Sequence, residues 1–554
     1  MDKDRRRILQ HSTAAVATLG LAELGLAAPA TKPAGAPADV QIELRAVRDQ
    51  VAVRLGNTTA VWRYQGKLLR GASGSLEPGG GYLGPTIRVR RGQRVQIEFT
   101  NDLPEPTTVH WHGLHVPDDM DGHPRHAVAP GQRFVYEFPI LNRAGTYWYH
   151  AHPHGRTGFQ IYHGLAGMFL VSDEEEQALA LPRGPHDIAL VLQDRNFDRE
   201  NQFVYPSGGM MDHGMMGGGM RDGGMRDRGM WDQGMDRDTR DRGMVDRRMS
   251  RSGMGDMMAS MMGVLGEQLL VSGRQMPRLQ VERRPYRLRL ANGSNTRTYK
   301  LGWSDGSPVT VLATDGGLLA APRERPFVML APAERVELWV DFARWPAGAD
   351  LALHSLAFDP GMMMMMMGGG ALPNGAEFPV LTLDLRGGGA VQATPAPRQL
   401  SQVPAAQAAV AINADRPKVF DLTMDMMAWG INGRSFDMLE ASAEETVKLG
   451  THEIWEFRND GRRSMGEVMA HSMHIHGLQF RVLGREVSDR FAKGYRTVRA
   501  GLVDEGWKDT VLVMPGERVR VLVGFEDYPG LFIYHCHMLE HEDTGMMRNY
   551  LVKA

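Results

Sequence analysis

Short stretches of alternating apolar and polar residues run along the chain from Val40 onward. Such stretches, rich in Val, Ile, Leu, Tyr and Phe, occupy residues 86–89, 94–99, 134–138 and 146–150. Gly, Pro, Asn and Asp separate them, which is the pattern of β-strands joined by turns. Long stretches with helical periodicity are scarce. The pattern predicts an all-β protein built of β-sandwiches, with only short helices.

Changes in composition divide the 554 residues into segments. At roughly 100 to 200 residues per domain, this length allows three or four domains. We predict a first domain over residues 40–172 and a second over residues 183–386. A linker rich in Gly, Ala and Pro at residues 387–411 leads to a third domain over residues 412–554.

Methionine is unusually abundant and unevenly distributed. Of the 37 methionines, 15 lie between Met210 and Met262, and six more form the run 362–367. The larger tract, residues 207–263, mixes Met with Gly, Arg and Asp and has almost no β-branched or aromatic residues. It cannot bury enough apolar surface to offset the entropy of the chain, so we predict that this insert in the second domain is disordered without a ligand.

The N-terminus has the order of charged, apolar and small residues of an export signal. Arg5, Arg6 and Arg7 precede a moderately apolar stretch at residues 14–28 and a small-residue site at residues 28–30. Paired arginines before a weakly apolar stretch indicate the twin-arginine (Tat) type of signal. We therefore predict a Tat-type signal peptide at residues 1–30 and a periplasmic mature protein. No other stretch approaches the ~18 apolar residues of a membrane helix, so no span is expected.

The charges of the chain are balanced. The formal net charge is −2 at pH 7 and the sequence pI is about 6.9. Because neither sign is in excess, neither nucleic acid nor an anionic membrane surface is expected as a partner. We expect a small-molecule partner and a monomer.

The chain has four clusters of histidines, and the last of them contains Cys536, the single cysteine. An exported chain with one cysteine has no internal disulfide, and metal ligation would protect its thiol from oxidation. On a strand, residues two apart share a face, so a His-x-His pair can bind one metal site, and imidazole is a common ligand of copper. The clusters are His110 and His112; His150 and His152; His471, His474 and His476; and His535, Cys536 and His537, followed by His541 and Met546.

Cys536 lies between two histidines, so on a strand its side chain points away from theirs and meets a different metal ion. With His471, His541 and a distant Met546 it completes the ligand set of a blue-copper electron-transfer centre. The remaining eight histidines are the number that a three-copper cluster requires.

These residues resemble those of the multicopper oxidases, and most closely the bacterial periplasmic cuprous oxidases of copper efflux. The resemblance covers essentially the whole mature chain and rests on the motifs at residues 107–113, 292–295, 314–319 and 535–546. It implies three cupredoxin-like Greek-key β-sandwich domains. It also implies four copper ions, one of type 1, one of type 2 and two of type 3.

The resemblance further implies which residues bind each copper ion. The cluster would lie between the first and third domains, and the second domain would hold these together. Asp121 and Glu542 match acidic positions that supply protons in the family, and we expect them to do so here, the alternative being surface carboxylates. The implied ligands are His471, Cys536, His541 and Met546 for type 1, His110 and His474 for type 2, and His112, His150, His152, His476, His535 and His537 for type 3.

The implied reaction reduces dioxygen to water with electrons from Cu(I) or from a small phenol. Thioether sulfur favours Cu(I), so the tracts 207–263 and 362–367 are candidate collectors of this ion. In the copper-efflux branch a similar segment lies later in the chain, and the alternative is an inert solubilising tract. A substrate-copper site is suggested by Met424, Asp425, Glu467 and Met469, unless the methionines only fill gaps in the core.

Three other functions remain open at this point. A laccase-like oxidase of phenols would share every copper ligand. A copper-free periplasmic scaffold would have lost ligands, whereas this set is complete. A copper store would leave unexplained why Cys536 is flanked by His535 and His537.

Overall fold

The computed structural model describes residues 37–206, 262–275, 278–361, 372–386, 392–425, 428–461 and 468–554. The predicted signal peptide, the run 362–367 and all of the tract 207–263 except Met262 and Gly263 lie outside these residues. Ala38–Ala554 forms one compact unit. No helix within the described ranges is long and apolar enough to cross a membrane.

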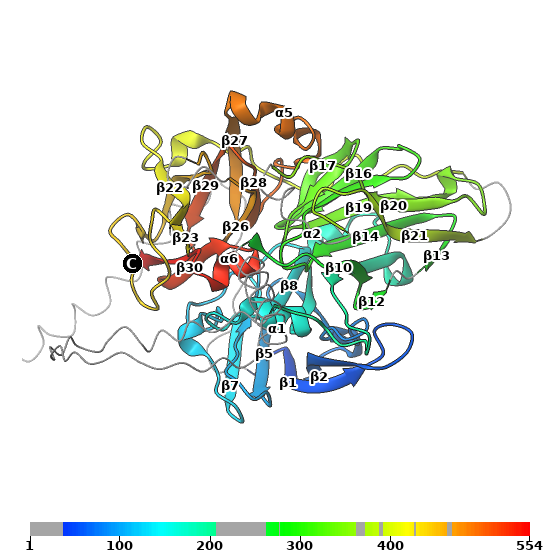
Figure 1. Ribbon diagram of the computed structural model, residues 1–554, viewed down its shortest axis with the longest axis horizontal. Helices are drawn as coiled ribbons and strands as arrows, with labels where there is room; N and C mark the ends of the chain where they lie inside the picture. The colour runs from blue at the N-terminus through cyan, green and yellow to red at the C-terminus, as the bar shows by residue number, and fades with distance from the viewer. Residues whose placement is uncertain are drawn as a thin grey trace, which may run out of the picture. The chain divides into compact units, whose positions relative to one another are not determined.

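The strands form six sheets that face one another in three pairs (Figure 1). The first pair has the strand orders β2-β1-β5-β7 and β3-β4-β9-β8-β6. Its strands are β1 (Val40–Val51), β2 (Thr59–Arg70), β3 (Leu76–Glu77), β4 (Thr86–Arg90), β5 (Arg94–Asn101), β6 (Val109–His110), β7 (Arg133–Pro139), β8 (Gly145–Ala151) and β9 (Ala166–Ser172).

The second pair has the orders β12-β11-β10-β14-β19-β16-β17 and β13-β21-β20-β15-β18. Its strands are β10 (Asp187–Arg195), β11 (Gln268–Val271), β12 (Arg274–Gln275), β13 (Arg278–Glu282), β14 (Pro285–Asn292), β15 (Tyr299–Trp303), β16 (Val309–Thr314), β17 (Gly317–Arg325), β18 (Val328–Leu330), β19 (Arg335–Asp341), β20 (Leu351–Ser355) and β21 (Phe378–Arg386).

The third pair has the orders β23-β22-β25-β29-β27 and β24-β31-β30-β26-β28. Its strands are β22 (Lys418–Asp425), β23 (Ala428–Ile431), β24 (Thr446–Lys448), β25 (Thr451–Arg458), β26 (His471–Ile475), β27 (Phe480–Val487), β28 (Thr510–Val513), β29 (Glu517–Phe525), β30 (Gly530–Cys536) and β31 (Met547–Lys553).

The same pairing recurs in all three pairs of sheets. The first strand of each pair (β1, β10, β22) runs antiparallel to the next strand along the chain and parallel to a later strand (β5, β14, β25). The facing sheet of each pair also contains one parallel pair of strands: β4 with β9, β13 with β21 and β24 with β31. Such crossovers between sheets are those of Greek-key sandwiches, so the predicted all-β fold class is confirmed.

Helices are short, as predicted. The α-helices are α1 (Thr157–His163), α2 (Glu174–Gln177), α5 (Ala492–Tyr495) and α6 (Leu539–Asp543), and the 3-10 turns are η1 (Ser73–Ser75), η2 (Pro124–His126), η3 (Gly184–His186), η4 (Phe342–Arg344), η5 (Ala408–Val410), η6 (Asp489–Phe491) and η7 (Arg499–Gly501). Helix α6 follows directly on β30 and is tied to α1, because the Asp543 carboxylate accepts hydrogen bonds from the backbone N–H groups of Thr157 (2.9 Å) and Gly158 (2.8 Å).

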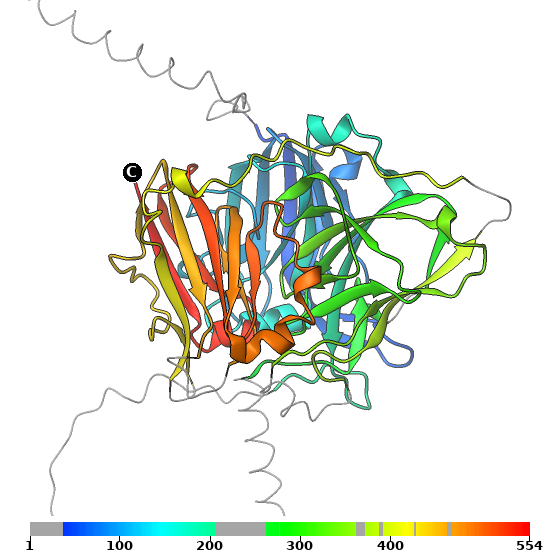
Figure 2. The ribbon, with the colours of Figure 1, turned by 90° about the horizontal axis from the view of Figure 1, so that it is seen from above.

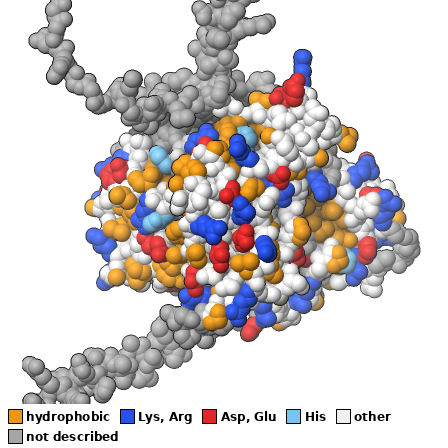
Figure 3. All heavy atoms as spheres, turned by 90° about the horizontal axis from the view of Figure 1, so that it is seen from below, with side chains coloured by type: hydrophobic (Ala, Val, Ile, Leu, Met, Phe, Trp, Pro, Cys, Tyr) orange, Lys and Arg blue, Asp and Glu red, His pale blue; other side chains and the backbone are white. Residues whose placement is uncertain are grey.

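Each pair of sheets encloses its own apolar core. A further buried cluster joins the first two pairs through residues that include Tyr82, Trp148, Leu270 and Ala291. Figure 2 shows the strands of the third pair beside those of the other two. On the face seen in Figure 3, basic and acidic side chains are interspersed, so no extended field of one sign covers it.

Candidate metal centre

Two adjacent strands and one helix converge on the cysteine. Cys536 ends β30, and His471 begins the neighbouring strand β26. The Sγ atom of Cys536 lies 3.6 Å from Nδ1 of His471 and 3.6 Å from Nδ1 of His541, which stands on α6. The Met546 backbone carbonyl accepts a hydrogen bond from the Cys536 N–H (3.0 Å). The Met546 side chain is buried in the same apolar core as Cys536. We call these four residues the cysteine site.

The cysteine site is sealed from water. Trp429 of β23 stacks on the His541 ring at a centroid distance of 4.3 Å and is 2% exposed. Burial lowers the pKa of His471 to about 3, so its imidazole is neutral and offers a lone pair. Burial also raises the pKa of the Cys536 thiol to about 12, so a thiolate at this position needs a bound cation. Two neutral imidazoles and a thiol in a dry pocket are donors that suit copper.

Eight buried histidines form a second group on the other side of Cys536. They come from the ends of β6 and β8 in the first pair of sheets and of β26 and β30 in the third. We call this group the histidine cluster. Its members are His110, His112, His150, His152, His474, His476, His535 and His537, each at most 1% exposed.

The ring nitrogens of the histidine cluster face one another at short range. The distances are 3.4 Å between Nε2 of His110 and His474, 3.3 Å between Nε2 of His152 and His535, 3.1 Å between Nε2 of His476 and His535, 3.3 Å between Nε2 of His150 and His537, and 3.3 Å between Nδ1 of His112 and Nε2 of His150. Three of these five contacts join a histidine of the first pair of sheets to a histidine of the third.

The outer nitrogens of several rings donate to backbone carbonyls. Nδ1 of His110 donates to the Asp121 carbonyl (2.7 Å), and Nδ1 of His474 to the Asp509 carbonyl (2.7 Å). Because a carbonyl only accepts, the proton sits on Nδ1 and the Nε2 lone pair points inward. Burial, assisted by neighbouring rings, also lowers the pKa of His152 to about 3. Lone pairs that face each other without a proton repel, and bound cations remove that repulsion, so the cluster fits copper ions.

The two predicted proton donors both touch the histidine cluster. Oδ2 of Asp121 lies 2.7 Å from Nδ1 of His476. The Glu542 carboxylate lies 3.0 Å from Nδ1 of His535 and 3.5 Å from Nε2 of His152. Both carboxylates are at most 1% exposed, so neither is the surface carboxylate that was the alternative.

The histidine pairs differ from the expectation in one respect. Strands β6, β8, β26 and β30 end at His110, Ala151, Ile475 and Cys536, so the second histidine of each pair lies just past its strand. Gly113 and Gly477, both with positive φ, follow two of these pairs and turn the chain. Two pairs, His110 with His112 and His474 with His476, nevertheless place their ligand atoms within 4.8 Å of each other, close enough to share a metal ion.

The proposed substrate-copper residues are only partly brought together. Met424 and Met469 are buried in the core that contains Cys536. Asp425 is exposed and, as the next residue along β22, points away from Met424. Glu467 lies outside the described residues.

Two site residues were not predicted from the sequence. Trp429 covers His541, and Asp509 contacts both His112 and His474. For Asp509 the sequence offered one signal, the charged pair Lys508 and Asp509 directly before the apolar strand β28. Charged residues at the start of a buried strand need partners, so this pair could have been predicted to make polar contacts.

The geometry first defines a class: a protein with one thiolate site and one multi-histidine site whose donors both suit copper. Two family models, both described as multicopper oxidase, match residues 71–176 and 411–554. A laccase of Bacillus stratosphericus is 30% identical over 535 residues, covering 88% of this chain and 90% of the laccase. The cell division protein FtsP of Escherichia coli is 29% identical over 477 residues, covering 85% of this chain and 84% of FtsP.

Solved structures agree with these matches. The crystal structure of the multicopper oxidase McoA from Aquifex aeolicus aligns with a TM-score of 0.70 and 32% identity, covering 94% of this chain and 97% of McoA. This chain belongs to the multicopper oxidase family. It is therefore an oxidoreductase that uses copper, as the sequence motifs predicted.

Proposed function

We propose that this oxidase transfers electrons from Cu(I) to dioxygen and thereby removes cuprous ions from the periplasm. Four cuprous ions are oxidised to cupric ions for each dioxygen, and with four protons two water molecules form. The proposed resident cofactor is one copper ion at the cysteine site and three at the histidine cluster, with the type 1, 2 and 3 assignments that the family resemblance implies.

The observation that best supports a cuprous substrate is where the methionine-rich sequences join the described structure. Tyr205 and Val264 flank the tract 207–263, and both donate to the Glu540 carboxylate, at 2.9 Å and 3.2 Å. Glu540 is the neighbour of His541 in the cysteine site. Met262 is itself buried in the core that contains Cys536.

The second tract joins the structure nearby. Gly361 directly precedes the run 362–367 and packs against Pro515 and the backbone of Val468, three residues before His471. Thioether sulfur is a soft ligand that prefers Cu(I), so soft donors near the electron-accepting site suit a cuprous substrate. In this proposal the tracts collect the ion.

The chain's own residues connect the two metal sites. Copper bound at these sites would supply one-electron redox chemistry and a place where dioxygen is reduced. The Cys536 backbone is bonded directly to His535 and His537, which is the shortest covalent connection between the cysteine site and the histidine cluster. Asp121 and Glu542 are proposed to hold protons at the edge of the cluster, next to His476 and His535.

The substrate is tested by comparing kcat/KM for Cu(I) and for 2,6-dimethoxyphenol. One variant lacks residues 207–261. A second variant keeps the length of this segment but has leucine in place of every methionine in it. We expect both variants to lose cuprous oxidation at least tenfold while phenol oxidation changes less than twofold. Parallel losses for both substrates, or no loss, would contradict a cuprous role of the tract. Oxygen uptake with excess Cu(I) then gives the stoichiometry.

The second candidate function is laccase-type oxidation of phenols, favoured by the similarity to a laccase. It shares the copper ligands, so the kinetic comparison separates the two. A copper-free scaffold role, suggested by the similarity to FtsP, is disfavoured because the ligand set is complete and converges. Copper content of the purified protein decides this point.

We also propose export through the Tat pathway to the periplasm. The support is the arginine pair Arg5 and Arg6 before the apolar stretch. Replacement of both by lysine should leave the full-length precursor in the cytoplasm, whereas replacement of Arg7 alone should not. Fractionation and immunoblotting measure the outcome, and unchanged export of the double variant would contradict the proposal.

A further inference from the structure

Asp121 and Asp509 occupy equivalent places on opposite sides of the histidine cluster. The backbone carbonyl of Asp121 accepts from His110, and its carboxylate contacts His476. The backbone carbonyl of Asp509 accepts from His474 (2.7 Å), and its carboxylate contacts Nε2 of His112 (3.1 Å). Each aspartate thus holds one histidine from its own domain and one from the other.

The two pairs of rings held in this way are stacked. His110 and His476 lie 3.6 Å apart between centroids with planes 24° apart. His112 and His474 lie 3.7 Å apart with planes 13° apart. The cluster therefore has an approximate two-fold arrangement, in which Asp509 is the counterpart of Asp121.

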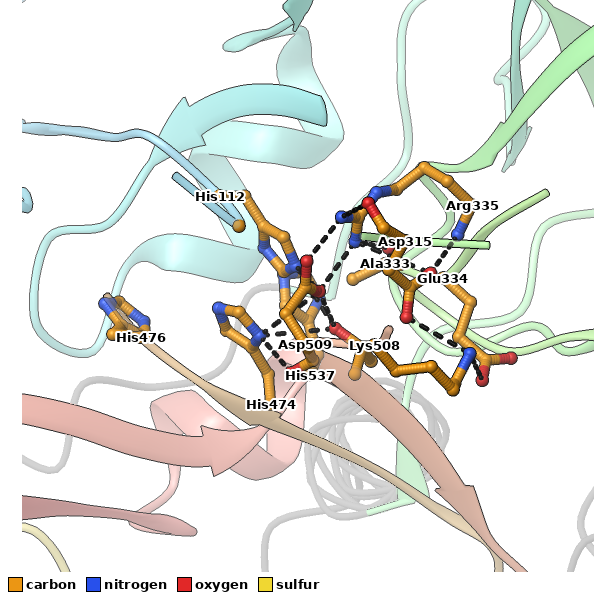
Figure 4. A network of polar contacts seen from close by, with 12 residues as sticks. His112, Asp315, Ala333, Glu334, Arg335, His474, His476, Lys508, Asp509 and His537 are labelled. Atoms are coloured by element: carbon orange, nitrogen blue, oxygen red, sulfur yellow. Dashed lines mark hydrogen bonds and ion pairs between the residues drawn. The ribbon is translucent and has the colours of Figure 1, made fainter. Parts of the chain in front are cut away.

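The two carboxylates differ in how they are compensated. Oδ1 of Asp121 makes no hydrogen bond with any described residue. Both oxygens of Asp509 accept from the Arg335 guanidinium, at 2.7 Å and 2.5 Å (Figure 4). A bidentate guanidinium fixes a carboxylate in plane as well as neutralising it. The geometry at Asp509 therefore suits orientation of imidazoles.

Arg335 belongs to β19 of the second domain and reaches all three domains. Its Nε donates to the Thr146 carbonyl in the first domain (3.0 Å), and its other nitrogens donate to the carbonyls of Ala333 and Asp315 and to Asp509. Its side chain is fully buried.

Lys508, the neighbour of Asp509, is held by the same domain. Its Nζ lies 3.1 Å from the Asp315 carboxylate and 3.1 Å from that of Glu334 (Figure 4). The backbone that presents the Asp509 carbonyl to His474 is thus fixed from two sides by second-domain charges.

We propose that Asp509 is a positioning residue of the histidine cluster and that Arg335 is the second domain's means of holding it. The Asp509 carboxylate accepts a hydrogen bond from Nε2 of His112, which keeps the proton on Nε2. The His112 ring therefore turns Nδ1 toward the cluster, whereas His110 and His474 turn Nε2 toward it. In this way a domain that contributes no histidine to the cluster sets the orientation of histidines in the other two. The inference rests on the proposal that the cluster binds copper.

The test compares Asp509→Asn and Arg335→Lys with a matched control, Arg287→Lys. Arg287 is also a buried arginine, bonded to Glu337 (2.7 Å) and Glu176, but none of these residues contacts a histidine of the cluster. The measurements use copper-loaded full-length protein. They give the copper content per chain, the thiolate-to-copper absorption, and the EPR signal of the proposed type 2 copper in the histidine cluster. Steady-state kinetics give kcat and KM for 2,6-dimethoxyphenol. Melting of copper-free protein reports stability separately.

We expect Asp509→Asn to alter the cluster EPR signal and to lower kcat about 10- to 100-fold, as loss of a residue that orients a metal ligand does. KM and the thiolate-to-copper absorption should not change, since the cysteine site is untouched. Arg335→Lys should act in the same direction, and the double variant should be no worse than Asp509→Asn. Arg287→Lys should keep the wild-type spectrum.

Three outcomes would overturn the inference. The first is a wild-type EPR signal and a kcat within twofold of the control in both variants. The second is an equal loss of absorption at the cysteine site. The third is failure of both variants, but not the control, to fold, which would assign the pair to folding. A wild-type protein without cluster copper would instead refute the proposed function.

Discussion

Cys536 lies at the boundary between the two metal sites, and its thiol is the one donor that histidine cannot replace. The side chain is fully buried, and burial raises its pKa to about 12. Removing the sulfur leaves a small cavity beside His471 and His541 while the histidine cluster keeps all its donors.

Cys536→Ser should therefore lose the intense thiolate-to-copper absorption and all turnover with either reductant, because the electron-accepting site is lost. The copper content and EPR signal of the histidine cluster should remain. Visible absorption, metal analysis and EPR on the same sample measure this. Persistence of the absorption would contradict the assignment to Cys536, because the chain has no second cysteine.

Asp121 and Glu542 can be separated from simple structural roles by their isosteric amides. Asp121→Asn and Glu542→Gln keep the shape and one acceptor oxygen, so copper content should be retained. We expect kcat to fall about 10- to 100-fold and the pH profile of turnover to change, because an amide cannot hold a proton for the cluster. Unchanged turnover and profile with full copper content would refute the role of that residue.

At the scale of elements, helix α6 combines more roles than its five residues suggest. The Glu540 carboxylate accepts hydrogen bonds from Asn295 (2.7 Å) and Thr296 (2.8 Å). It also accepts from Tyr205 and Val264, which flank the methionine-rich tract. His541 belongs to the cysteine site, and Asp543 holds α1. The sequence motif predicted the metal ligands of this segment but not the hydrogen bonds that hold α6 in place. The partners of Glu540 lie more than 240 residues away along the chain.

Glu540 offers a test of anchoring at this scale. Glu540→Ala removes the acceptor of three buried donors and of the half-buried Tyr205 hydroxyl. At about 1 kcal/mol or more for each buried donor, it should lower the free energy of unfolding by several kcal/mol. Glu540→Gln retains one acceptor oxygen and should be milder, but it should raise KM for Cu(I) more than KM for 2,6-dimethoxyphenol. Thermal melting and steady-state kinetics measure both effects. An equal rise in the two KM values would show that Glu540 does not serve the cuprous substrate.

Alternation of apolar and polar residues was enough to predict the strands, because each sheet buries one face. It could not show that β6, β8, β26 and β30 stop within a residue of the first histidine of each pair, since strand ends depend on partners distant in sequence. The same limit applies to Asp509, whose partners Arg335 and His112 come from other domains. Met424 and Asp425 were grouped by sequence proximity, although neighbours on a strand point to opposite faces.

At the scale of the whole molecule, the histidine cluster joins the first domain to the third. Removing copper restores the repulsion between facing lone pairs, so we expect a lower melting temperature for the copper-free protein; a ligand at 1,000 times its Kd contributes ~4 kcal/mol. Hydrogen exchange should increase at β6, β8, β26 and β30 while β14 and β19 of the second domain stay protected. A uniform increase in hydrogen exchange across all domains, or no increase in any of them, would argue against an interface held by metal ions.

The order of the ligands along the chain has a consequence for biosynthesis. Among the described residues, four of the five groups of donors that converge in the fold include a residue from His471 onward, and the cysteine site needs Cys536 and His541. Translation must therefore pass His541 before the cysteine site and the histidine cluster have all their histidine and cysteine donors. Products terminated before His541 would lack the thiolate absorption and the activity, so both properties report that translation has passed this residue.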